Sequence, residues 1–338
     1  MLTLRTPYLV FLGDEADAGY AKTGVGLAYW RPDLCVGQMR LSDNAADAGL
    51  PDQSIQEARA AGAQSVVLGV AMVGGAIPAE WLPILVEALE AGMDVVAGFH
   101  TRLSSFPELV DASERGGANL VDVRVPPADI PVGTGQKRTG RRLLTVGTDC
   151  ALGKKYTALA LAKGMAASGM SADFRATGQT GILIAGGGLP LDAVVADFLV
   201  GAAEKVSPDN DPDHWDVIEG QGALFHPGYG PVSMGLLVGS QPDAFVVCTE
   251  AGRDTIRGWD SFSTPDIRDV IARTIDIGRQ FNPDIRCVGI SANTRHLDPS
   301  ARADYLGALE KEYGLPAIDP IATGVEPIVT RLAAEFVQ

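Results

Sequence analysis

The residues from 145 to 161, TVGTDCALGKKYTALAL, combine the types that bind phosphate groups in proteins. They read as the end of a hydrophobic strand, a turn between Gly147 and Gly153, and a helix rich in Ala and Leu. The glycines allow the backbone to curl so that successive N–H groups point inward, and the helix N-terminus adds unpaired donors and partial positive charge. We predict a phosphate-binding loop made of Gly147, Thr148, Asp149, Cys150, Ala151, Leu152, Gly153, Lys154, Lys155 and Tyr156.

The residue after the glycine–lysine pair departs from the standard phosphate-binding loop. The standard loop, GxxxxGK[ST], places a hydroxyl after the lysine to ligate magnesium. This chain has Lys155 at that position and one more residue between the two glycines. A lysine cannot ligate a cation, so we predict that protein charge holds the phosphates and that there is no metal site. This arrangement favours a ligand whose phosphates are a binding handle, such as coenzyme A, over one whose phosphates react.

Two titratable side chains follow the predicted strand in 216-DVIEGQGALFHPGYG-230. Glu219 ends that strand, where a carboxylate commonly acts as a metal partner or a general base. His226 titrates near neutral pH and can accept a proton if it faces the substrate. The sequence leaves both residues open as the catalytic base.

Polar residues after the other predicted strands are candidates for binding ligands. Arginine guanidinium groups match carboxylates with two parallel hydrogen bonds, which makes the arginines candidates for an acidic substrate. Asn293 is predicted to bind the cofactor, because polar residues at such strand ends often read an adenine or position a substrate. The predicted substrate-binding residues are Arg175, Thr177, Gln179, Thr180, Gln221, Glu250, Arg253 and Arg295.

The elements that must position these residues are strands that alternate with helices. Short apolar runs are separated by amphipathic helical patterns such as 80-EWLPILVEALEAG-92. Near-continuous Val/Ile/Leu strands of this kind indicate parallel sheets covered by helices on both faces, so the predicted class is α/β. The predicted strands are 8–13, 65–70, 94–99, 120–125, 142–147, 216–220, 244–249 and 286–291.

A segment rich in Pro and Gly, 126-PPADIPVGTGQKRTG-140, interrupts this alternation and predicts two domains. We expect an α/β domain over residues 1–130, a linker over 131–141 and a second α/β domain over 142–338. In the first domain, the segment 69–78 and His100 each follow a predicted strand end. Ligands bind at such ends in open sheets, although a plain surface position is equally compatible with both.

The charge, the cysteines and the apolar runs of the chain indicate which binding partners and which cellular location to expect. The formal net charge of −15 argues against nucleic acid or an anionic membrane, although 135-GQKRTGRR-142 together with 153-GKK-155 could form a local basic pocket. The cysteines lie far apart, which is typical of reduced thiols in a cytoplasmic protein. The N-terminus reaches acidic residues too early for a signal peptide, and the apolar run 66–77 is shorter than the roughly 20 residues of a membrane span. We expect a cytoplasmic homo-oligomer that acts on a small molecule.

Five blocks of the sequence together resemble a known family: VGTDCALGKKYTALAL, RATGQTGI, DVIEGQGALFHPGY, CTEAGR and SANTR. The GTD followed by GK, and the later EGQG turn, are similar to dethiobiotin synthetase, a P-loop enzyme that uses ATP. The whole chain is more similar to a two-domain bacterial and archaeal family long described as of unknown function. That resemblance implies a Rossmann-like N-terminal domain and a P-loop NTPase-like C-terminal domain.

The resemblance also implies an activity. The family includes D-glutamate N-acetyltransferases, which move an acetyl group from acetyl-CoA to the amine of D-glutamate, and the loop glycines and Lys154 carry over directly. Lys155 departs from the dethiobiotin synthetase pattern, which argues against ATP chemistry. Two alternatives stay open. One is an ATP–Mg-dependent ligase or kinase, with Glu219 and Asp149 holding magnesium, and the other is a non-catalytic nucleotide sensor.

Overall fold

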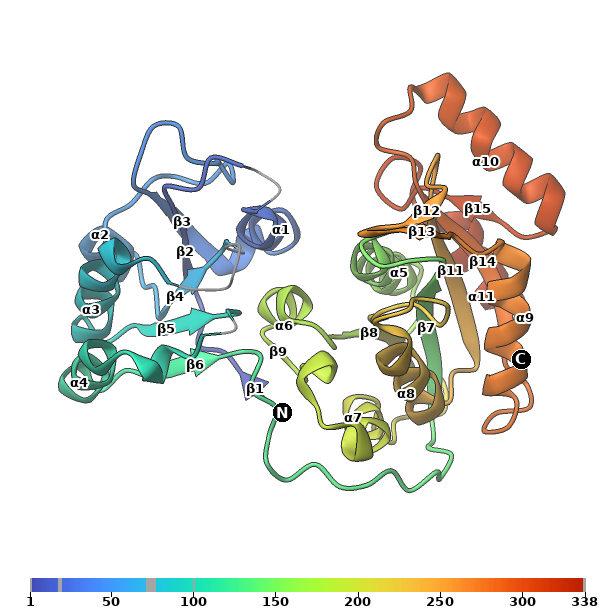
Figure 1. The fold of residues 1–338 in the computed structure, drawn as a ribbon, viewed down its shortest axis with the longest axis horizontal. Coiled ribbons are helices and arrows are strands. Elements are labelled where there is room, and N and C mark those ends of the chain that lie inside the picture. Colours follow the sequence, from blue (N-terminus) through green and yellow to red (C-terminus); the bar gives the residue numbers. More distant parts are fainter. Residues whose placement is uncertain (1, 18–19, 71–76, 100, 337–338) are drawn as a thin grey trace. The chain divides into compact units, whose positions relative to one another are not determined.

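The computed structural model describes residues 2–17, 20–70, 77–99 and 101–336, and the chain forms two compact units (Figure 1). The first unit comprises Met1–Pro127 and Gly178–Pro190, and the second comprises Ala128–Thr177 and Leu191–Gln338. Within the described ranges, no helix combines the length and the apolar character needed to cross a membrane. Residues 71–76 of the segment 69–78, and His100, lie outside the described residues.

The first unit is built on a parallel sheet that has five strands among the described residues, in the order β3-β2-β4-β5-β6. Its inner strands are buried throughout and mainly apolar, as expected for a parallel sheet with both faces covered. β1 (Leu2–Thr3) pairs antiparallel with β9 (Gly187–Gly188), which joins the segment 178–190 to this unit. The sheet strands are β2 (Tyr8–Gly13), β3 (Cys35–Arg40), β4 (Ser65–Leu68), β5 (Asp94–Ala97) and β6 (Leu120–Asp122). The helices are α1 (Lys22–Trp30), α2 (Ile55–Ala60), α3 (Leu82–Glu90), α4 (Pro107–Gly116) and α6 (Gln179–Ala185), with 3₁₀ turns at Pro32–Leu34, Ala79–Trp81 and Leu103–Ser105.

The second unit is built on a larger parallel sheet, which has six strands among the described residues in the order β15-β14-β11-β7-β10-β8. The sheet strands are β7 (Arg141–Gly147), β8 (Ala172–Arg175), β10 (Trp215–Ile218), β11 (Ala244–Glu250), β14 (Arg286–Asn293) and β15 (Ala317–Ile318), and a separate hairpin joins β12 (Thr255–Ile256) to β13 (Trp259–Ser263). The helices are α5 (Lys154–Ala167), α7 (Leu199–Val206), α8 (Gly230–Ser240), α9 (Ile267–Gly278), α10 (Pro299–Tyr313) and α11 (Glu326–Phe336), with 3₁₀ turns at Leu191–Ala193 and Ala196–Phe198.

Two groups of helices pack on the second sheet. α5 packs against β7, β8 and β10 and contacts α11, whereas α8 packs against β7 and contacts α7 and α9. Because the sheet strands are parallel, β7, β10, β11 and β14 end at the same edge. Open α/β sheets bind their ligands at that edge, and β7 in the middle of the sheet places the predicted loop there.

The predicted α/β class is confirmed, and each of the eight predicted strands overlaps an observed one. β3 and β8 were not predicted. Both lie at sheet edges and carry partly exposed side chains, so neither reads as a continuous apolar run. The continuous pattern belongs to the inner strands, which are buried on both faces.

The segment 123–140 contains no helix or strand, but hydrogen bonds fix its C-terminal part to the second unit. The carboxylate of Glu204 accepts backbone N–H bonds from it at 2.8 and 2.9 Å. Arg138 donates to a backbone carbonyl oxygen at 2.6 Å, and the fully buried Arg142 donates to others at 2.9 and 3.1 Å. The basic run 135–142 therefore anchors the linker through the protein's own oxygen atoms. It does not form the local basic pocket that its charge suggested.

Candidate active site

The loop between β7 and α5 has the backbone geometry of an anion site. Ala151 has a φ of 53° and Gly153 a φ of 105°, both in the left-handed region. A β-carbon on Gly153 would meet no described atom within 4 Å, so its φ, and not the surrounding space, favours glycine. No side chain in the described chain caps α5, and its first turn holds no acidic residue. The partial positive charge of the helix N-terminus is therefore directed at the loop.

The two lysines that follow the loop have different surroundings. Lys154 is buried, and its Nζ donates to the backbone carbonyl oxygen of Asp149 at 2.7 Å. Burial lowers the pKa of Lys154. Lys155 is half-buried, and its Nζ lies 4.4 Å from the ring centroid of Tyr156. Lys154 is thus the lysine whose ammonium contacts the loop backbone.

Thr157 does not take the place of the hydroxyl that the standard loop supplies. It is buried, and its Oγ1 lies 2.8 Å from Oγ of Ser291 on β14. The same oxygen lies 3.6 Å from Sγ of Cys248 on β11. These contacts direct the hydroxyl toward the sheet, in keeping with a loop that holds phosphates through backbone N–H groups and a lysine.

Asp149 is the centre of a hydrogen-bond network at the ends of β7, β11 and β14. Its buried carboxylate accepts from Nη1 of Arg253 and from the backbone N–H of Arg257, both at 2.9 Å. Arg253 also pairs with Glu250, which accepts from Nδ2 of Asn293 at 3.1 Å. The structure therefore brings together Asp149, Glu250, Arg253 and Asn293, and it engages Arg253 with two protein carboxylates.

Glu219 directly follows β10 and is buried. Its Oε2 accepts the backbone N–H of Thr177 at 3.0 Å, and the hydroxyl of Thr177 donates to the carbonyl oxygen of Glu219 at 2.7 Å. Nε2 of Gln221 donates to the same hydroxyl at 3.1 Å. Burial and the charge of Glu219 raise the pKa of Tyr156. These four predicted site residues therefore form a second cluster beside the start of α5.

His226 is buried, with its ring packed against Tyr229 and Trp259 at centroid distances of 4.7 Å each. Its Nδ1 accepts the backbone N–H groups of Gly228 and Tyr229, both at 3.1 Å. Its Nε2 lies 3.8 Å from Oδ1 of Asp149. Burial lowers the pKa of His226 and so favours a neutral ring at pH 7.

Two further predicted substrate-binding residues, Arg175 and Thr180, have partners outside the loop, and Gln179 lies beside Thr180 in the chain. Arg175 donates from Nε to Oδ1 of the buried Asp216 at 2.6 Å. Gln179 and Thr180 lie in α6, which belongs to the first unit, and Oγ1 of Thr180 lies 3.1 Å from Oγ1 of Thr23. In the part of the chain that the structure describes, Arg175, which lies in the same unit as the loop, does not hydrogen-bond to it.

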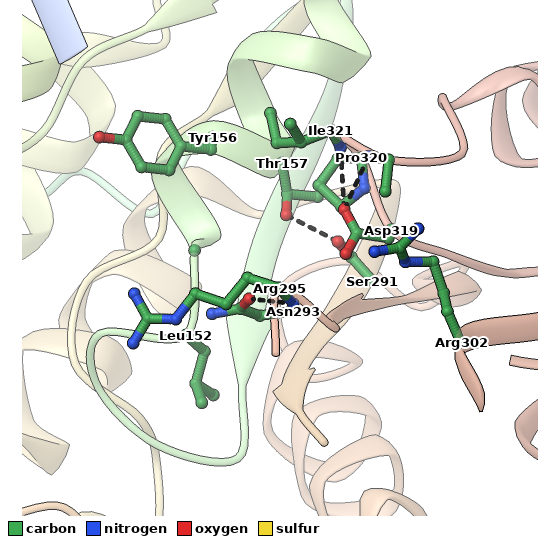
Figure 2. Close-up of a pocket in the computed structure, with 12 residues that line it drawn as sticks. Leu152, Tyr156, Thr157, Ser291, Asn293, Arg295, Arg302, Asp319, Pro320 and Ile321 are labelled. Carbon is green, nitrogen blue, oxygen red and sulfur yellow. Dashed lines mark hydrogen bonds between the residues drawn. The ribbon is translucent and has the colours of Figure 1, made fainter. Parts of the chain in front are cut away.

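A pocket of about 360 Å³ opens beside the loop (Figure 2). Figure 2 shows side chains of the loop and α5 around it, together with side chains from β14 and from the segment after β15. The side chain of Arg295 is 76% exposed, and its Nη2 lies 3.9 Å from Oε1 of Glu250. The lining residues are Leu152, Gly153, Tyr156, Thr157, Ser291, Asn293, Arg295, Arg302, Asp319, Pro320, Ile321 and Ala322.

Arg302 and the residues 319–322 line this pocket and were not predicted. β15 has two residues, which is too short to read as a strand, so the polar residue after it was not recognised as a strand end. Oδ1 of Asp319 accepts the backbone N–H groups of Ile321 and Ala322 at 3.0 Å each, which shapes this wall. The available signal was 318-IDPIATG-324, an apolar residue followed by Asp-Pro.

Both halves of the chain match known domain models. A model described as the P-loop domain of DUF1611, a domain of unknown function, matches residues 131–329. A second model, described as the Rossmann-like domain of the same family, matches residues 38–126. The chain belongs to the DUF1611 family. The resemblance inferred from the five sequence blocks is thereby confirmed, together with the Rossmann-like and P-loop character of the two domains.

Two named proteins and one solved structure are similar to this chain over nearly the full length. A protein from Tritonibacter scottomollicae named D-glutamate N-acetyltransferase is 48% identical over 331 residues, which cover 98% of this chain and 99% of that protein. A protein of the same name from Pseudoalteromonas is 46% identical over 331 residues, which cover 98% of this chain and 100% of that protein. The crystal structure of a DUF1611 family protein from Anabaena variabilis is 31% identical with a TM-score of 0.83, and the match covers 98% of this chain and 100% of that one.

Proposed function

We propose that this protein is an N-acetyltransferase that moves an acetyl group from acetyl-CoA to the amine of D-glutamate. The observation that carries the proposal is the identity of 48% and 46% to two proteins named D-glutamate N-acetyltransferase. Each alignment covers 98% of this chain, so the similarity extends over both domains and over the loop, the strand ends and the pocket.

The phosphate-binding loop and the pocket suit the nucleotide end of acetyl-CoA. We propose that the phosphates bind at the N-terminus of α5, where Lys154 exchanges its bond to the carbonyl oxygen of Asp149 for one to a phosphate oxygen. The adenosine then occupies the neighbouring pocket, with Asn293 beside the adenine. The pocket volume of about 360 Å³ lies within the range of sites that hold small molecules.

The transfer requires a neutral amine, because an ammonium group has no lone pair with which to attack a thioester. We propose that Glu219 takes this proton and that Thr177 and Gln221, which surround it, help to place the acceptor. The amine nitrogen bonds to the acetyl carbon, and collapse of the tetrahedral intermediate breaks the C–S bond. The second proton of the amine passes to the departing thiolate, so coenzyme A leaves as the thiol. Backbone N–H groups of a glycine turn stabilise the oxyanion in between.

Arg295 is the best placed of the predicted arginines to bind an anionic group of a ligand. Arg175 and Arg253 pair with protein carboxylates at 2.6 and 2.9 Å. Arg295 is exposed beside the pocket and lies 3.9 Å from its nearest protein carboxylate. We propose that it pairs with a carboxylate of D-glutamate or with the 3′-phosphate of acetyl-CoA.

The experiment is a thiol-release assay with purified protein, acetyl-CoA and D-glutamate. Thiol release that depends on D-glutamate, with formation of N-acetylglutamate measured by mass spectrometry, supports the proposal. L-Glutamate and a reaction without acceptor serve as controls. Thiol release no greater than in the reaction without acceptor, with either enantiomer, would refute it.

A thermal-shift comparison tests the ATP-dependent alternative. A ligand at 100 times its dissociation constant stabilises a folded protein by about 2.7 kcal/mol. We expect stabilisation by acetyl-CoA to exceed that by ATP with magnesium at the same concentration. The opposite order, combined with magnesium-dependent release of phosphate, would favour a ligase or kinase.

A further inference from the structure

The two ring nitrogens of His226 have different surroundings, and this decides which of them carries the hydrogen. Nδ1 accepts two backbone N–H groups, those of Gly228 and Tyr229, at 3.1 Å each. A nitrogen that accepts hydrogen bonds must keep its lone pair, so in the neutral ring the hydrogen is on Nε2. Nε2 then has no lone pair, and that of Nδ1 is already engaged. A ring in this state donates a hydrogen bond and does not accept a proton from a substrate.

Nε2 of His226 lies near the carboxylate of Asp149. The two side chains are 1% and 0% exposed, and Nε2 lies 3.8 Å from Oδ1 of the carboxylate. Within the described residues Nε2 has no hydrogen-bond partner. Oδ1 of Asp149 already accepts the backbone N–H of Cys150 at 2.6 Å, Oδ2 is held by Arg253, and the backbone carbonyl oxygen holds Nζ of Lys154. The separation of 3.8 Å is longer than a hydrogen bond, so a bond from Nε2 to Oδ1, which can accept a second donor, forms only when the ring moves closer to the residue that organises the loop.

The same residues resemble a metal-ligand set, because one ligand atom each from Asp149, Cys150 and His226 lies within 4.8 Å of the others. A metal ion would need a lone pair on Nε2, and Nδ1 would then have to carry the hydrogen. The backbone N–H groups that point at Nδ1 leave no room for that hydrogen. The guanidinium of Arg253 on Asp149 also repels a cation. The cluster therefore suits a hydrogen bond better than a metal ion.

We propose that His226 is a neutral hydrogen-bond donor that positions Asp149, and through it the phosphate-binding loop, and that it is not the general base. The titratable groups that face the ring are Asp149, Cys150, Lys154 and Tyr229. This proposal depends on the proposed acetyl transfer only where it concerns the effect of His226 on turnover. The tautomer and the effect on ligand binding are measurable without turnover.

Nitrogen-15 NMR of the histidine rings in the full-length, ligand-free protein tests the tautomer. The chain has four histidines, and loss of signals in His226→Gln identifies those of His226. We expect a protonated Nε2 and an unprotonated Nδ1 throughout the range from about pH 6 to 8, where an ordinary histidine titrates. A hydrogen on Nδ1, or a charged ring at pH 7, would overturn the proposal.

Two substitutions test the positioning role. His226→Phe keeps an aromatic ring against Tyr229 and Trp259 but removes the donor, whereas His226→Gln keeps an N–H donor. We expect His226→Phe to weaken acetyl-CoA binding about fivefold in calorimetry, as loss of one hydrogen bond does, and His226→Gln to recover most of the affinity. His214→Gln is the matched control, because that histidine bonds Ser171 at the other end of β10 and should not affect binding.

The pH dependence of kcat/KM separates a positioning residue from a base. We expect both His226 variants to keep every ionisation that the wild-type profile shows between about pH 6 and 8. Loss of an ionisation in both variants would identify His226 as the base, and one equivalent of zinc bound by the wild type but not by His226→Phe would identify a metal ligand. Either result overturns the proposal. If acetyl transfer is not detected, calorimetry with acetyl-CoA or ADP and the NMR measurement still decide it, even if His226→Phe does not fold.

Discussion

Replacing Lys154 by methionine separates the cost of burying its charge from the benefit of binding phosphate. The residue is 6% exposed, and the single described hydrogen bond of its Nζ is to one carbonyl oxygen, at 2.7 Å. Burial lowers its pKa, which means that the folded protein disfavours the ammonium form. Replacing buried ionic groups by apolar side chains of similar volume is often neutral or stabilising by about 1–4 kcal/mol. We therefore expect ligand-free Lys154→Met to melt at the wild-type temperature or above it.

The affinity for acetyl-CoA should change in the opposite direction. A charge-assisted hydrogen bond contributes about 1.5–3 kcal/mol, so Lys154→Met should weaken binding roughly 10- to 150-fold. Lys155→Met is the matched control. The Lys155 ammonium is half-buried over the ring of Tyr156, and its loss should cost about 0–1 kcal/mol, or up to about fivefold in affinity. Calorimetric titration of both variants and the wild type at one salt concentration measures the difference.

Two results would refute this reasoning. If Lys154→Met binds acetyl-CoA normally while Lys155→Met does not, the second lysine is the phosphate ligand and the loop has been interpreted one residue too early. If ligand-free Lys154→Met melts well below the wild type, the buried ammonium of Lys154 stabilises the ligand-free protein. Burying that charge would then not be a free-energy cost that ligand binding offsets. Circular dichroism melts without ligand distinguish the second result from a simple loss of binding.

Three further predictions follow from individual residues. A β-carbon on Gly220 would lie 1.7 Å from the carbonyl oxygen of Thr145, so Gly220→Ala should destabilise the protein by about 3 kcal/mol or more in urea denaturation, whereas Gly307→Ala on α10, with open space around it, should not. Arg295→Gln should raise the KM of one substrate about tenfold, and the affected substrate distinguishes a D-glutamate carboxylate from a coenzyme A phosphate; two unchanged KM values would contradict the assignment. Burial raises the pKa of the Cys248 thiol from 9.0 to about 11 and that of Cys287 to about 12, so the folded state keeps protons that the unfolded state loses. The free energy of unfolding should therefore fall as the pH rises above 9, and less steeply in Cys248→Ala; an equal slope in that variant would contradict this account.

Structural features that depend on residues close together in the sequence could be predicted. The inner strands appear in the sequence as mainly apolar runs, because both of their faces are buried. The loop is recognisable for a similar reason, since two glycines, a lysine and a following helix lie within one short segment. β15 was not predicted, because a strand of two residues has no periodicity. For the same reason Asp319, which follows β15, was not predicted to line the pocket.

By itself, the sequence determined that this protein has parallel sheets, a P-loop-type turn without the usual hydroxyl, and polar residues at the strand ends. Only the tertiary structure decided what those polar residues contact. Arg253 is held by Asp149, which lies 104 positions away in the chain, and Arg175 is held by Asp216, 41 positions away. His226 acquired its donor geometry from backbone N–H groups whose direction depends on the local turn. The physical reason is that parallel strands bring distant segments to one edge, where the partner of each charge depends on strand order and register.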